Sequence, residues 1–264
     1  MHSIFDAARA AARNKAIEPG FKAAANRCGA MQLGIEAGLG WGYAARLPQL
    51  PRKDLAMTKL YYSPGACSLS PHIVLHESGL PFQAVLASTK THKLADGTDY
   101  YGINPKGYVP LLELDDGTRL SEGPVIVQYI ADQVPASGLA PAAGTMERYR
   151  VMEWLNFITS ELHKGFSPLF TPGMPEEAKV LARAKLVDRL TWVDTQLAGK
   201  SYLMGEHFTV PDAYLFTVAG WGRHVGVDIS GLPNLSAFMA RMAARPAVQA
   251  AMKAEGLIKQ AQQA

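Results

Sequence analysis

The feature that most constrains the fold of this chain is a change of sequence pattern near residue 140. Upstream of it, short β-rich runs alternate with helical patterns, namely KLYY at 59–62, a helix at 70–79, FQAVLA at 82–87, a hairpin of 109–114 and 118–120, and a helix at 123–134. Downstream of the turn-rich residues 135–144, helical patterns alone follow, at about 145–170, 176–197, 211–225 and 234–255. We therefore predict an α/β domain over 57–137 that is joined to an all-helical domain over 144–264.

Residues 1–56 differ from the rest of the chain in charge and composition. They carry eight Lys or Arg and four Asp or Glu, whereas residues 57–264 carry 18 basic and 19 acidic residues. The body therefore has no charge excess that would attract nucleic acid or a membrane surface, and we predict neither as a partner. The Ala- and Gly-rich segment 1–56 lacks the pattern of a secretory signal. We interpret it as a disordered extension or the product of an upstream start, with an organellar transit peptide as the alternative.

The cysteine content indicates the redox compartment. Cys28 and Cys67 are too few for a disulfide scaffold, which favours a reducing, cytoplasmic location. No apolar run reaches the roughly 18 residues that a membrane helix needs.

Cys67 is the first candidate for chemistry, because it follows the turn Pro64-Gly65 and precedes a predicted helix. The positive end of a helix dipole and free backbone N–H groups favour a thiolate at such a position. The run Cys67-Ser68-Leu69-Ser70 replaces the second thiol of a dithiol motif by a hydroxyl. Such a cysteine can form a mixed disulfide with an external thiol but cannot resolve it internally. The alternative is a buried and inert cysteine.

Two further candidates lie at the predicted hairpin and at the helix after it. Pro110 opens the strand 109–114, so it belongs at a sheet edge or at a strand start. In thioredoxin-like folds a cis-proline facing the active cysteine occupies this position, and an ordinary trans-proline is the alternative. Ser121 and Glu122 precede the helix at 123–134, where backbone donors suit a ligand carboxylate and the Glu122 carboxylate suits an ammonium group. Simple helix capping explains the same two residues.

The helical half adds a polar stripe. Asn156, Ser160 and His163 are spaced i, i+4 and i+7, so an α-helix would place them on one face, which is either a site or a solvated surface. His163 can exchange a hydrogen bond with a thiol near neutral pH. His72 and His76 have metal-ligand spacing, but no further ligand follows in a recognised pattern, and we predict no metal.

Five strings in order carry a resemblance to a known family: SPGACSL, NPKGYVPLLELDDG, LSEGPVIVQYIAD, EWLNFITSELHKGF and FTVPDAYLF. Over about residues 58–258 the chain resembles the bacterial beta-class glutathione S-transferases. The resemblance implies an N-terminal thioredoxin-like domain that binds glutathione and a C-terminal helical-bundle domain. It also implies a homodimer with a site at the cleft between the domains.

The resemblance assigns roles to individual residues. Cys67 matches the site cysteine that contacts the glutathione sulfur, and Ser68 and His163 are expected around the same sulfur. Val109 matches the residue whose backbone pairs with the cysteinyl part of glutathione, before the cis-proline Pro110. The remaining positions are Glu122 and Gly123 for the γ-glutamyl part, Asn156, Ser160 and His163 facing the thiol, and Thr209 and Asp212 as a buried structural capping box. Where the family commonly has a lysine for the glycyl carboxylate, this chain has His92 followed by Lys93, and either can serve.

We therefore predict a glutathione S-transferase that conjugates glutathione, its co-substrate, to hydrophobic electrophiles. An alternative reaction is glutathione-dependent thiol–disulfide exchange, with Cys67 acting as a monothiol. A non-enzymatic alternative is a carrier that binds hydrophobic ligands in the cleft.

Overall fold

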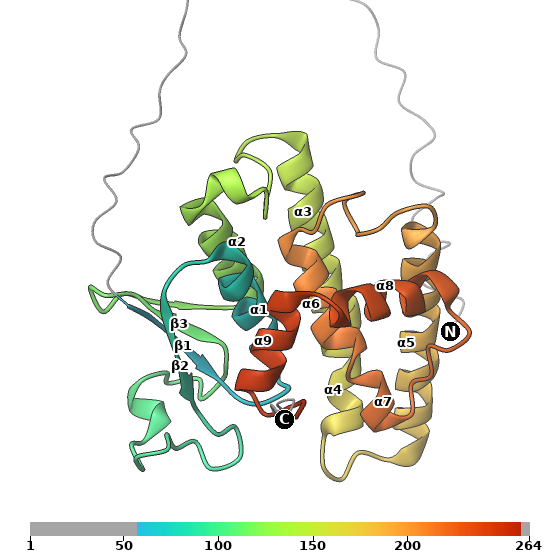
Figure 1. Cartoon of the computed structure of the whole chain (residues 1–264). Coiled ribbons are helices and arrows are strands. Elements are labelled where there is room, and N and C mark those ends of the chain that lie inside the picture. Colours follow the sequence, from blue (N-terminus) through green and yellow to red (C-terminus); the bar gives the residue numbers. More distant parts are fainter. Residues whose placement is uncertain (1–56, 260–264) are drawn as a thin grey trace, which may run out of the picture. The chain divides into compact units, whose positions relative to one another are not determined.

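The computed structural model describes residues 57–259, where a small sheet lies beside a group of helices (Figure 1). Strand β1 (Thr58–Tyr62) pairs in parallel with β2 (Phe82–Leu86) and antiparallel with β3 (Leu111–Glu113), which pairs antiparallel with β4 (Arg119–Ser121). The strand order is therefore β2-β1-β3-β4. Leu60 on β1 lies opposite Leu112 on β3, and both side chains are fully buried.

Two helices complete this α/β layer. Helix α1 (Leu69–Ser78) connects the parallel strands β1 and β2, and α2 (Gly123–Gln133) follows β4. Gly79 ends α1 with φ of 67°, a left-handed conformation that glycine adopts without a steric penalty. The strands and helices of this half lie where the sequence pattern predicts them. Residues 88–104 are irregular as expected, apart from isolated bridges and the 3-10 turn η1 (Tyr100–Gly102).

The second half consists of helices, after the 3-10 turn η2 (Pro135–Ser137). The predicted helix at 145–170 is divided into α3 (Met146–Phe157), a π-helical turn η3 (Ile158–His163) and α4 (Lys164–Phe170). Helix α5 (Glu176–Leu197) matches its prediction. The last two predicted helices are each broken, giving α6 (Val210–Ala219), α7 (Gly222–Val225), α8 (Pro233–Ala243) and α9 (Pro246–Ala254).

Both breaks have local causes. Pro246 lacks an N–H and cannot continue α8, so it starts a new helix instead. Gly222 packs so closely on the segment after α7 that an added Cβ would lie 2.7 Å from the carbonyl oxygen of Val227. This packing leaves no room for a side chain at position 222, where α7 starts.

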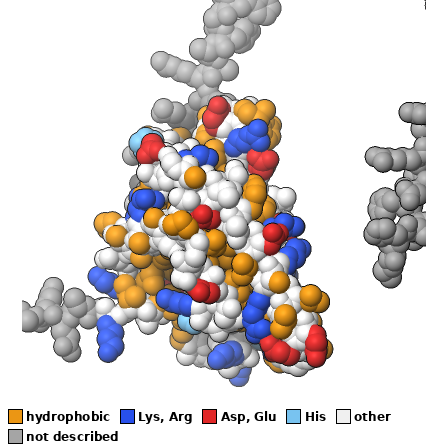
Figure 2. All heavy atoms as spheres, turned by 90° about the vertical axis from the view of Figure 1, so that its right-hand side faces the viewer, with side chains coloured by type: hydrophobic (Ala, Val, Ile, Leu, Met, Phe, Trp, Pro, Cys, Tyr) orange, Lys and Arg blue, Asp and Glu red, His pale blue; other side chains and the backbone are white. Residues whose placement is uncertain are grey.

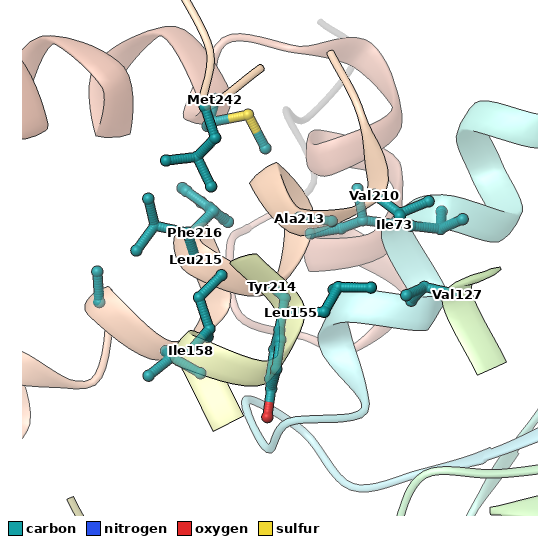
Figure 3. Close-up of a cluster of buried hydrophobic side chains, with 14 of the residues drawn as sticks. Ile73, Val127, Leu155, Ile158, Val210, Ala213, Tyr214, Leu215, Phe216 and Met242 are labelled. Atoms are coloured by element: carbon teal, nitrogen blue, oxygen red, sulfur yellow. The ribbon is translucent and has the colours of Figure 1, made fainter. Parts of the chain in front are cut away.

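Helix α6 is the centre of the hydrophobic core. Every residue from Val210 to Ala219 is buried, and most of these side chains are apolar. Figure 3 shows Ile73 of α1 and Val127 of α2 meeting Val210 and Ala213 of α6. One continuous cluster thus runs from the sheet through α1 and α2 into the helical half, and α1 also packs against α9.

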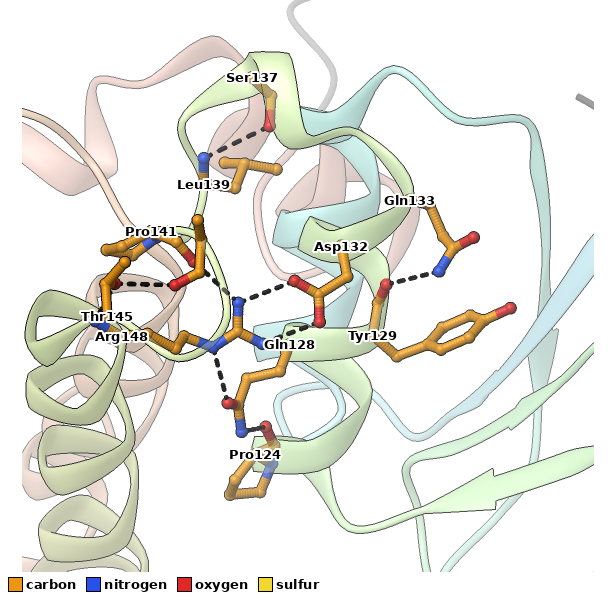
Figure 4. Close-up of polar contacts among 11 residues, drawn as sticks. Pro124, Gln128, Tyr129, Asp132, Gln133, Ser137, Leu139, Pro141, Thr145 and Arg148 are labelled. Carbon is orange, nitrogen blue, oxygen red and sulfur yellow. Dashed lines mark hydrogen bonds and ion pairs between the residues drawn. The ribbon is translucent and has the colours of Figure 1, made fainter. Parts of the chain in front are cut away.

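A buried arginine ties the connection between the two halves. The Arg148 guanidinium on α3 donates two hydrogen bonds of 2.8 Å to the Asp132 carboxylate on α2, and it also donates to Gln128 and to the carbonyl oxygen of Pro141 (Figure 4). A planar guanidinium suits such a multiple contact because its donors have a fixed geometry. Arg148 therefore fixes the connecting residues against α2 and α3.

The predicted fold class, a thioredoxin-like α/β domain followed by a helical bundle, is confirmed. The domain limits 57–137 and 144–264 stay a prediction, and the interpretation of residues 1–56 lies outside the described residues. Among residues 57–259, no helix is long and apolar enough to cross a membrane. On the face seen in Figure 2, charges of both signs are scattered among hydrophobic side chains.

Candidate active site

The loop that carries Cys67 is held on both sides by the helical half. It runs from β1 to α1 through Ser63, Pro64, Gly65 and Ala66. The Gly65 N–H donates to Glu255 Oε2 at 2.9 Å, and the Trp221 Nε1–H donates to the Gly65 carbonyl oxygen at 2.9 Å. Glu255 directly follows α9, and Trp221 lies between α6 and α7. A single peptide segment two residues before Cys67 is thus fixed by side chains from two distant parts of the chain.

The histidine pair with metal-ligand spacing supports this contact. His72 Nδ1 lies 2.8 Å from Glu255 Oε1, and both side chains are almost completely buried. The rings of His72 and His76 are stacked with centroids 5.2 Å apart. Within residues 57–259, no group of three or more His, Cys, Asp or Glu side chains is placed to hold a metal ion. His72 therefore orients the carboxylate that binds the cysteine loop.

The Cys67 thiol faces the segment that contains Pro110. Its Sγ donates to the Val109 carbonyl oxygen at 3.2 Å, and the Val109–Pro110 peptide bond is cis. Burial raises the pKa of Cys67 to about 11, although the backbone N–H groups of Cys67 and Ser68 lower it. The expectation that the helix start favours a thiolate is therefore wrong for this state. Desolvation dominates, and α1 begins only at Leu69, so the thiol is a hydrogen-bond donor.

Ser68 makes its hydrogen bonds within the cysteine loop. Its side chain is fully buried, and its hydroxyl accepts from the Ser63 N–H at 3.1 Å and donates to the Ser63 carbonyl oxygen at 3.2 Å. These bonds close the loop on itself. The expectation that Ser68 lies around the glutathione sulfur stays a prediction, and in this structure its hydroxyl is used inside the loop.

His163 ends the π-helical turn and lines the same cleft as Cys67. Its Nδ1 lies 2.6 Å from the Tyr214 hydroxyl, and its ring packs edge-on against Trp221 at 4.9 Å. Burial lowers the pKa of His163 to about 4, with a further contribution from Lys164, so the imidazole is neutral at pH 7.

Tyr214 determines which nitrogen of His163 carries the proton. Burial raises the pKa of Tyr214, so its hydroxyl stays protonated. Its other neighbour, Thr159 Oγ1, is 3.5 Å away and makes a shorter bond of 2.8 Å to the Leu155 carbonyl oxygen. Because the contact with His163 is the shorter one, we assign the Tyr214 O–H as donor to His163 Nδ1, which leaves the proton of the neutral ring on Nε2. The Tyr214 hydroxyl points out of the hydrophobic cluster in Figure 3.

The three polar residues expected on one face are separated. Asn156 is exposed and lines a hollow of about 290 Å³ together with Glu122 and Gln128, and Ser160 is exposed and donates to the Asn156 carbonyl oxygen at 3.0 Å. His163 instead lines the cleft at Cys67. The cause is the π turn, which holds more residues per turn than an α-helix and rotates His163 away from the line of the other two.

Glu122 has an unusual backbone and a counter-ion that the sequence pattern did not reveal. Its φ is 71°, a conformation that non-glycine residues rarely adopt. Its carboxylate lies 2.9 Å from Lys106 Nζ, which also contacts Ser121 Oγ at 3.4 Å. The Glu122 side chain makes no capping hydrogen bond to α2, so capping does not explain this residue. Gly123 follows it and packs next to Pro110.

His92 and Lys93 lie in the irregular segment before β3. His92 has φ of 52°, and its ring packs against the Tyr101 ring at 4.5 Å. Its Nδ1 is buried without a hydrogen-bond partner, close to Gly107, where an added Cβ would lie 2.9 Å from it. Lys93 is exposed. Of the two, His92 is the one whose side chain the fold holds in place.

The cleft beside Cys67 has a volume of about 1080 Å³. The cysteine loop and His163 line it together with apolar side chains from α4, α6, α8 and α9, including Phe170, Phe216, Met239 and Met252. Trp221, Arg223 and His224 also line it. Sequence reasoning missed Trp221 and Tyr214, because single aromatic residues in an apolar helical pattern read as core. A cleft of this size can hold an apolar small molecule beside Cys67.

Thr209 and Asp212 form the expected capping box at the start of α6. The Asp212 carboxylate accepts from the Thr209 N–H and hydroxyl at 2.8 and 2.9 Å, and from the Leu203 N–H at 2.8 Å. Burial raises the pKa of Asp212 to about 6, against the lowering effect of these hydrogen bonds. The pair is a structural element, away from the cleft.

Comparison with known proteins agrees with this geometry. The family profile described as "Glutathione S-transferase, N-terminal domain" matches residues 65–133, and that described as "Glutathione S-transferase, C-terminal domain" matches residues 157–246. The chain is 50% identical to Glutathione S-transferase GstA of Escherichia coli O157:H7 over 199 residues, which is 75% of this chain and 99% of that protein.

Solved structures give the same result. The bacterial glutathione transferase BphK in a ternary complex is 56% identical, with a TM-score of 0.74 over 75% of this chain and 99% of that one. A beta-class glutathione S-transferase of Sphingomonas chungbukensis is 50% identical, with a TM-score of 0.73 over 76% and 100%. A sphingomonad glutathione S-transferase complexed with glutathione is 48% identical, with a TM-score of 0.73 over 76% and 100%. The resemblance to bacterial beta-class enzymes is confirmed.

Proposed function

Since the chain belongs to the glutathione S-transferase family, we propose that it transfers glutathione to hydrophobic electrophiles. The glutathione sulfur attacks an electrophilic carbon, a C–S bond forms, and the bond from that carbon to its leaving group breaks. The thiol proton passes to solvent, and the leaving group departs with its electron pair. The observation that carries the proposal is that Cys67 and the neutral His163 both line one largely apolar cleft of about 1080 Å³.

Glutathione would lie along the segment before β3. Its cysteinyl part would pair with the backbone of Val109, next to cis-Pro110, and its γ-glutamyl part would lie at Glu122 and Gly123. Asn156, which shares a hollow with Glu122, and Ser160 would contact the same end of the ligand. His92 or Lys93 would bind the glycyl carboxylate, and the fixed side chain of His92 favours His92.

In this arrangement the protein stabilises the glutathione thiolate by donating to it. The Cys67 thiol is protonated and donates at present to Val109, and the His163 Nε2 carries a proton because Tyr214 occupies Nδ1. Lowering the pKa of a thiol from about 8.5 to about 6.5 corresponds to about 2.7 kcal/mol and makes most of it nucleophilic at neutral pH. A protonated Cys67 suits this donor role better than the role of an attacking nucleophile.

The test is the conjugation of 1-chloro-2,4-dinitrobenzene with glutathione by the full chain. The rate is measured from the absorbance of the conjugate. We expect a rate proportional to enzyme concentration and saturable in glutathione. His163→Ala should lower kcat/KM for glutathione by at least tenfold, because one donor to the thiolate is lost. No rate above the uncatalysed reaction in the wild type would remove the proposal.

We also infer a homodimer and a cytoplasmic location, where reduced glutathione is available. Exposed apolar side chains lie on α2 and α3, with Val125 45%, Tyr149 55% and Met152 43% exposed. A second copy of the chain is the partner that would cover them. Light scattering after gel filtration should give twice the mass of the chain, and Tyr149→Asp should shift it to the monomer. The matched substitution Leu86→Asp, at the β2 edge of the sheet, should not.

A further inference from the structure

A positive charge without an acidic partner lies in the wall of the cleft. Arg223 on α7 lines the cleft and donates from Nε to His224 Nε2 at 3.0 Å. Within residues 57–259 no carboxylate pairs with it, whereas Arg148 pairs with Asp132 and Arg245 pairs with Glu77. The two terminal nitrogens of Arg223 have no acceptor in the described part of the protein. They are therefore free to bind a ligand.

The surroundings of Arg223 strengthen its field. The residues that line the cleft include no Asp and no Glu in the described part of the chain, so Arg223 carries the one permanent charge of this lining. The other walls are formed by apolar side chains such as Phe216, Met239 and Leu257. A charge beside low-dielectric walls attracts a counter-ion more strongly than the same charge on an open surface.

The segment that carries Arg223 is fixed relative to Cys67. Trp221, two residues before Arg223, donates to the Gly65 carbonyl oxygen in the cysteine loop. Helix α7 is held from its other side, because Arg183 Nε donates to the Val225 carbonyl oxygen at 3.0 Å. His224 occupies only one of the five N–H donors of the guanidinium and orients the rest. The backbone that carries Arg223 is thus held relative to the cysteine loop, and the exposed Arg223 side chain lines the cleft.

We propose that this cleft selects hydrophobic electrophiles that carry an anionic group, such as a carboxylate or a sulfonate, and that Arg223 binds this group. The inference rests on the proposed function and names the substrate class of the same site. An aryl chloride with a ring carboxylate is a simple member of the class. The glutathione sulfur forms a bond to the ring carbon, the C–Cl bond breaks, chloride leaves with the electron pair, and the thiol proton goes to solvent.

The test uses two electrophiles that differ in one ring substituent and in net charge, 4-chloro-3,5-dinitrobenzoate and its neutral amide. The measured quantity is the ratio of kcat/KM for the benzoate to kcat/KM for the amide, each corrected for its uncatalysed rate. Arg223→Gln should lower this ratio about tenfold, and Arg223→Lys should retain part of it. The matched control is Lys253→Gln, which removes one exposed positive charge from α9 outside the cleft lining and should leave the ratio unchanged.

Ionic strength and ligand binding give two independent readouts. Salt screens an exposed charge, so raising its concentration from about 0.02 M to about 0.3 M should lower the benzoate-to-amide ratio of kcat/KM in the wild type. The same ratio in Arg223→Gln should stay nearly constant. Dye binding is followed by fluorescence, with the anionic 1-anilinonaphthalene-8-sulfonate and the uncharged N-phenyl-1-naphthylamine. Arg223→Gln should weaken the binding of the anionic dye about tenfold and leave the binding of the uncharged dye nearly unchanged.

The outcomes separate the two proposals. If the wild type conjugates the amide and the ratio is the same in Arg223→Gln, the assignment of anionic substrates is overturned while the transferase function stands. If dye binding shows no charge preference, the assignment is overturned as well. If the wild type conjugates neither electrophile, the proposed function fails, and this inference fails with it.

Discussion

The Nδ1 atom of His163 lies 2.6 Å from the hydroxyl oxygen of Tyr214, and the two residues are 51 positions apart in the chain. The hydroxyl belongs to α6, the buried centre of the core, and the imidazole ends a π-helical turn at the cleft. A rigid core helix therefore sets the tautomer of a side chain that faces the substrate.

We predict that Tyr214→Phe lowers kcat/KM for glutathione about five- to tenfold, because the neutral ring of His163 then populates both tautomers. The measurement is a pH profile of kcat/KM. The wild-type profile should show no titration of His163 between pH 5 and 8, since the pKa of His163 is about 4. Thr159→Val removes the 3.5 Å neighbour together with a local hydrogen bond to the Leu155 carbonyl oxygen, and it should behave like the wild type. Equal losses in both variants would show that the Tyr214 contact is merely structural.

The high pKa of Cys67 predicts slow and strongly pH-dependent alkylation. Below a pKa of about 11 the thiolate fraction rises about tenfold per pH unit, so the rate with iodoacetamide should rise in this way from pH 7 to pH 10. Peptide mass spectrometry separates Cys67 from Cys28. A rate that levels off near pH 7 would contradict the protonated thiol and restore the thiolate reading.

Replacing Cys67 by alanine separates the two reactions considered for this site. We expect conjugation of an uncharged aryl chloride to continue at a reduced rate, since His163 still donates to the glutathione sulfur. Glutathione-dependent reduction of a disulfide substrate should disappear, because no sulfur remains to form the mixed disulfide. Both activities are measured on one preparation, and persistence of both would mean that Cys67 takes no part in either.

The contact between Glu255 and the cysteine loop should stabilise the protein as well as the site. Glu255→Leu leaves the Gly65 N–H and His72 Nδ1 buried without an acceptor, which should lower the free energy of unfolding by about 3 kcal/mol. Trp221→Phe leaves one carbonyl unpaired and should cost about 1 kcal/mol. Urea unfolding followed by circular dichroism measures both. Indistinguishable midpoints for Glu255→Leu and the wild type would rule this out.

Asp212 should give the capping box a measurable pH dependence. The pKa of Asp212 is about 6 in the folded protein and near its ordinary value of 3.8 in the unfolded chain, so the folded state binds more protons between these values. Its contribution to stability is therefore largest below pH 3.8 and is lost as the pH rises through 6. The Asn side chain of Asp212→Asn cannot ionise, so this variant lacks the pH-dependent contribution. The free energy of unfolding of the wild type minus that of the variant should therefore fall by up to about 3 kcal/mol from pH 4 to pH 7. A difference that grows toward neutral pH would contradict the raised pKa.

Much of the fold follows from local patterns. The turn at Gly79 and the period of the apolar residues are sufficient to place α1. Pro246 also carries a local signal that a helix ends before it, which the single helix predicted over 234–255 overlooked. The π turn at Ile158–His163 has no such signal, because one residue more or less in a helical turn leaves the apolar pattern almost unchanged. The separation of Asn156 from His163 could not be predicted for this reason.

The features of the site that could be predicted are those carried by a motif or by the family resemblance. The roles that depend on contacts between residues far apart in the chain could not be predicted. The cis-proline at Pro110 and the capping box of Thr209 and Asp212 are in the structure as expected. The roles of Ser68 and Tyr214 depend on partners that only the folded chain supplies. The pKa of Cys67 depends on how completely the helical half covers it, which no local pattern reveals.

The double attachment of Gly65 has a consequence for the use of this protein in engineering. The peptide that precedes Cys67 is held by Glu255 and Trp221, 190 and 156 residues further along the chain. The α/β half is therefore not a transplantable module, since a fragment ending before α3 would lose both anchors of its own cysteine loop. Grafts that exchange the helical half to alter substrate choice must carry these two side chains with them.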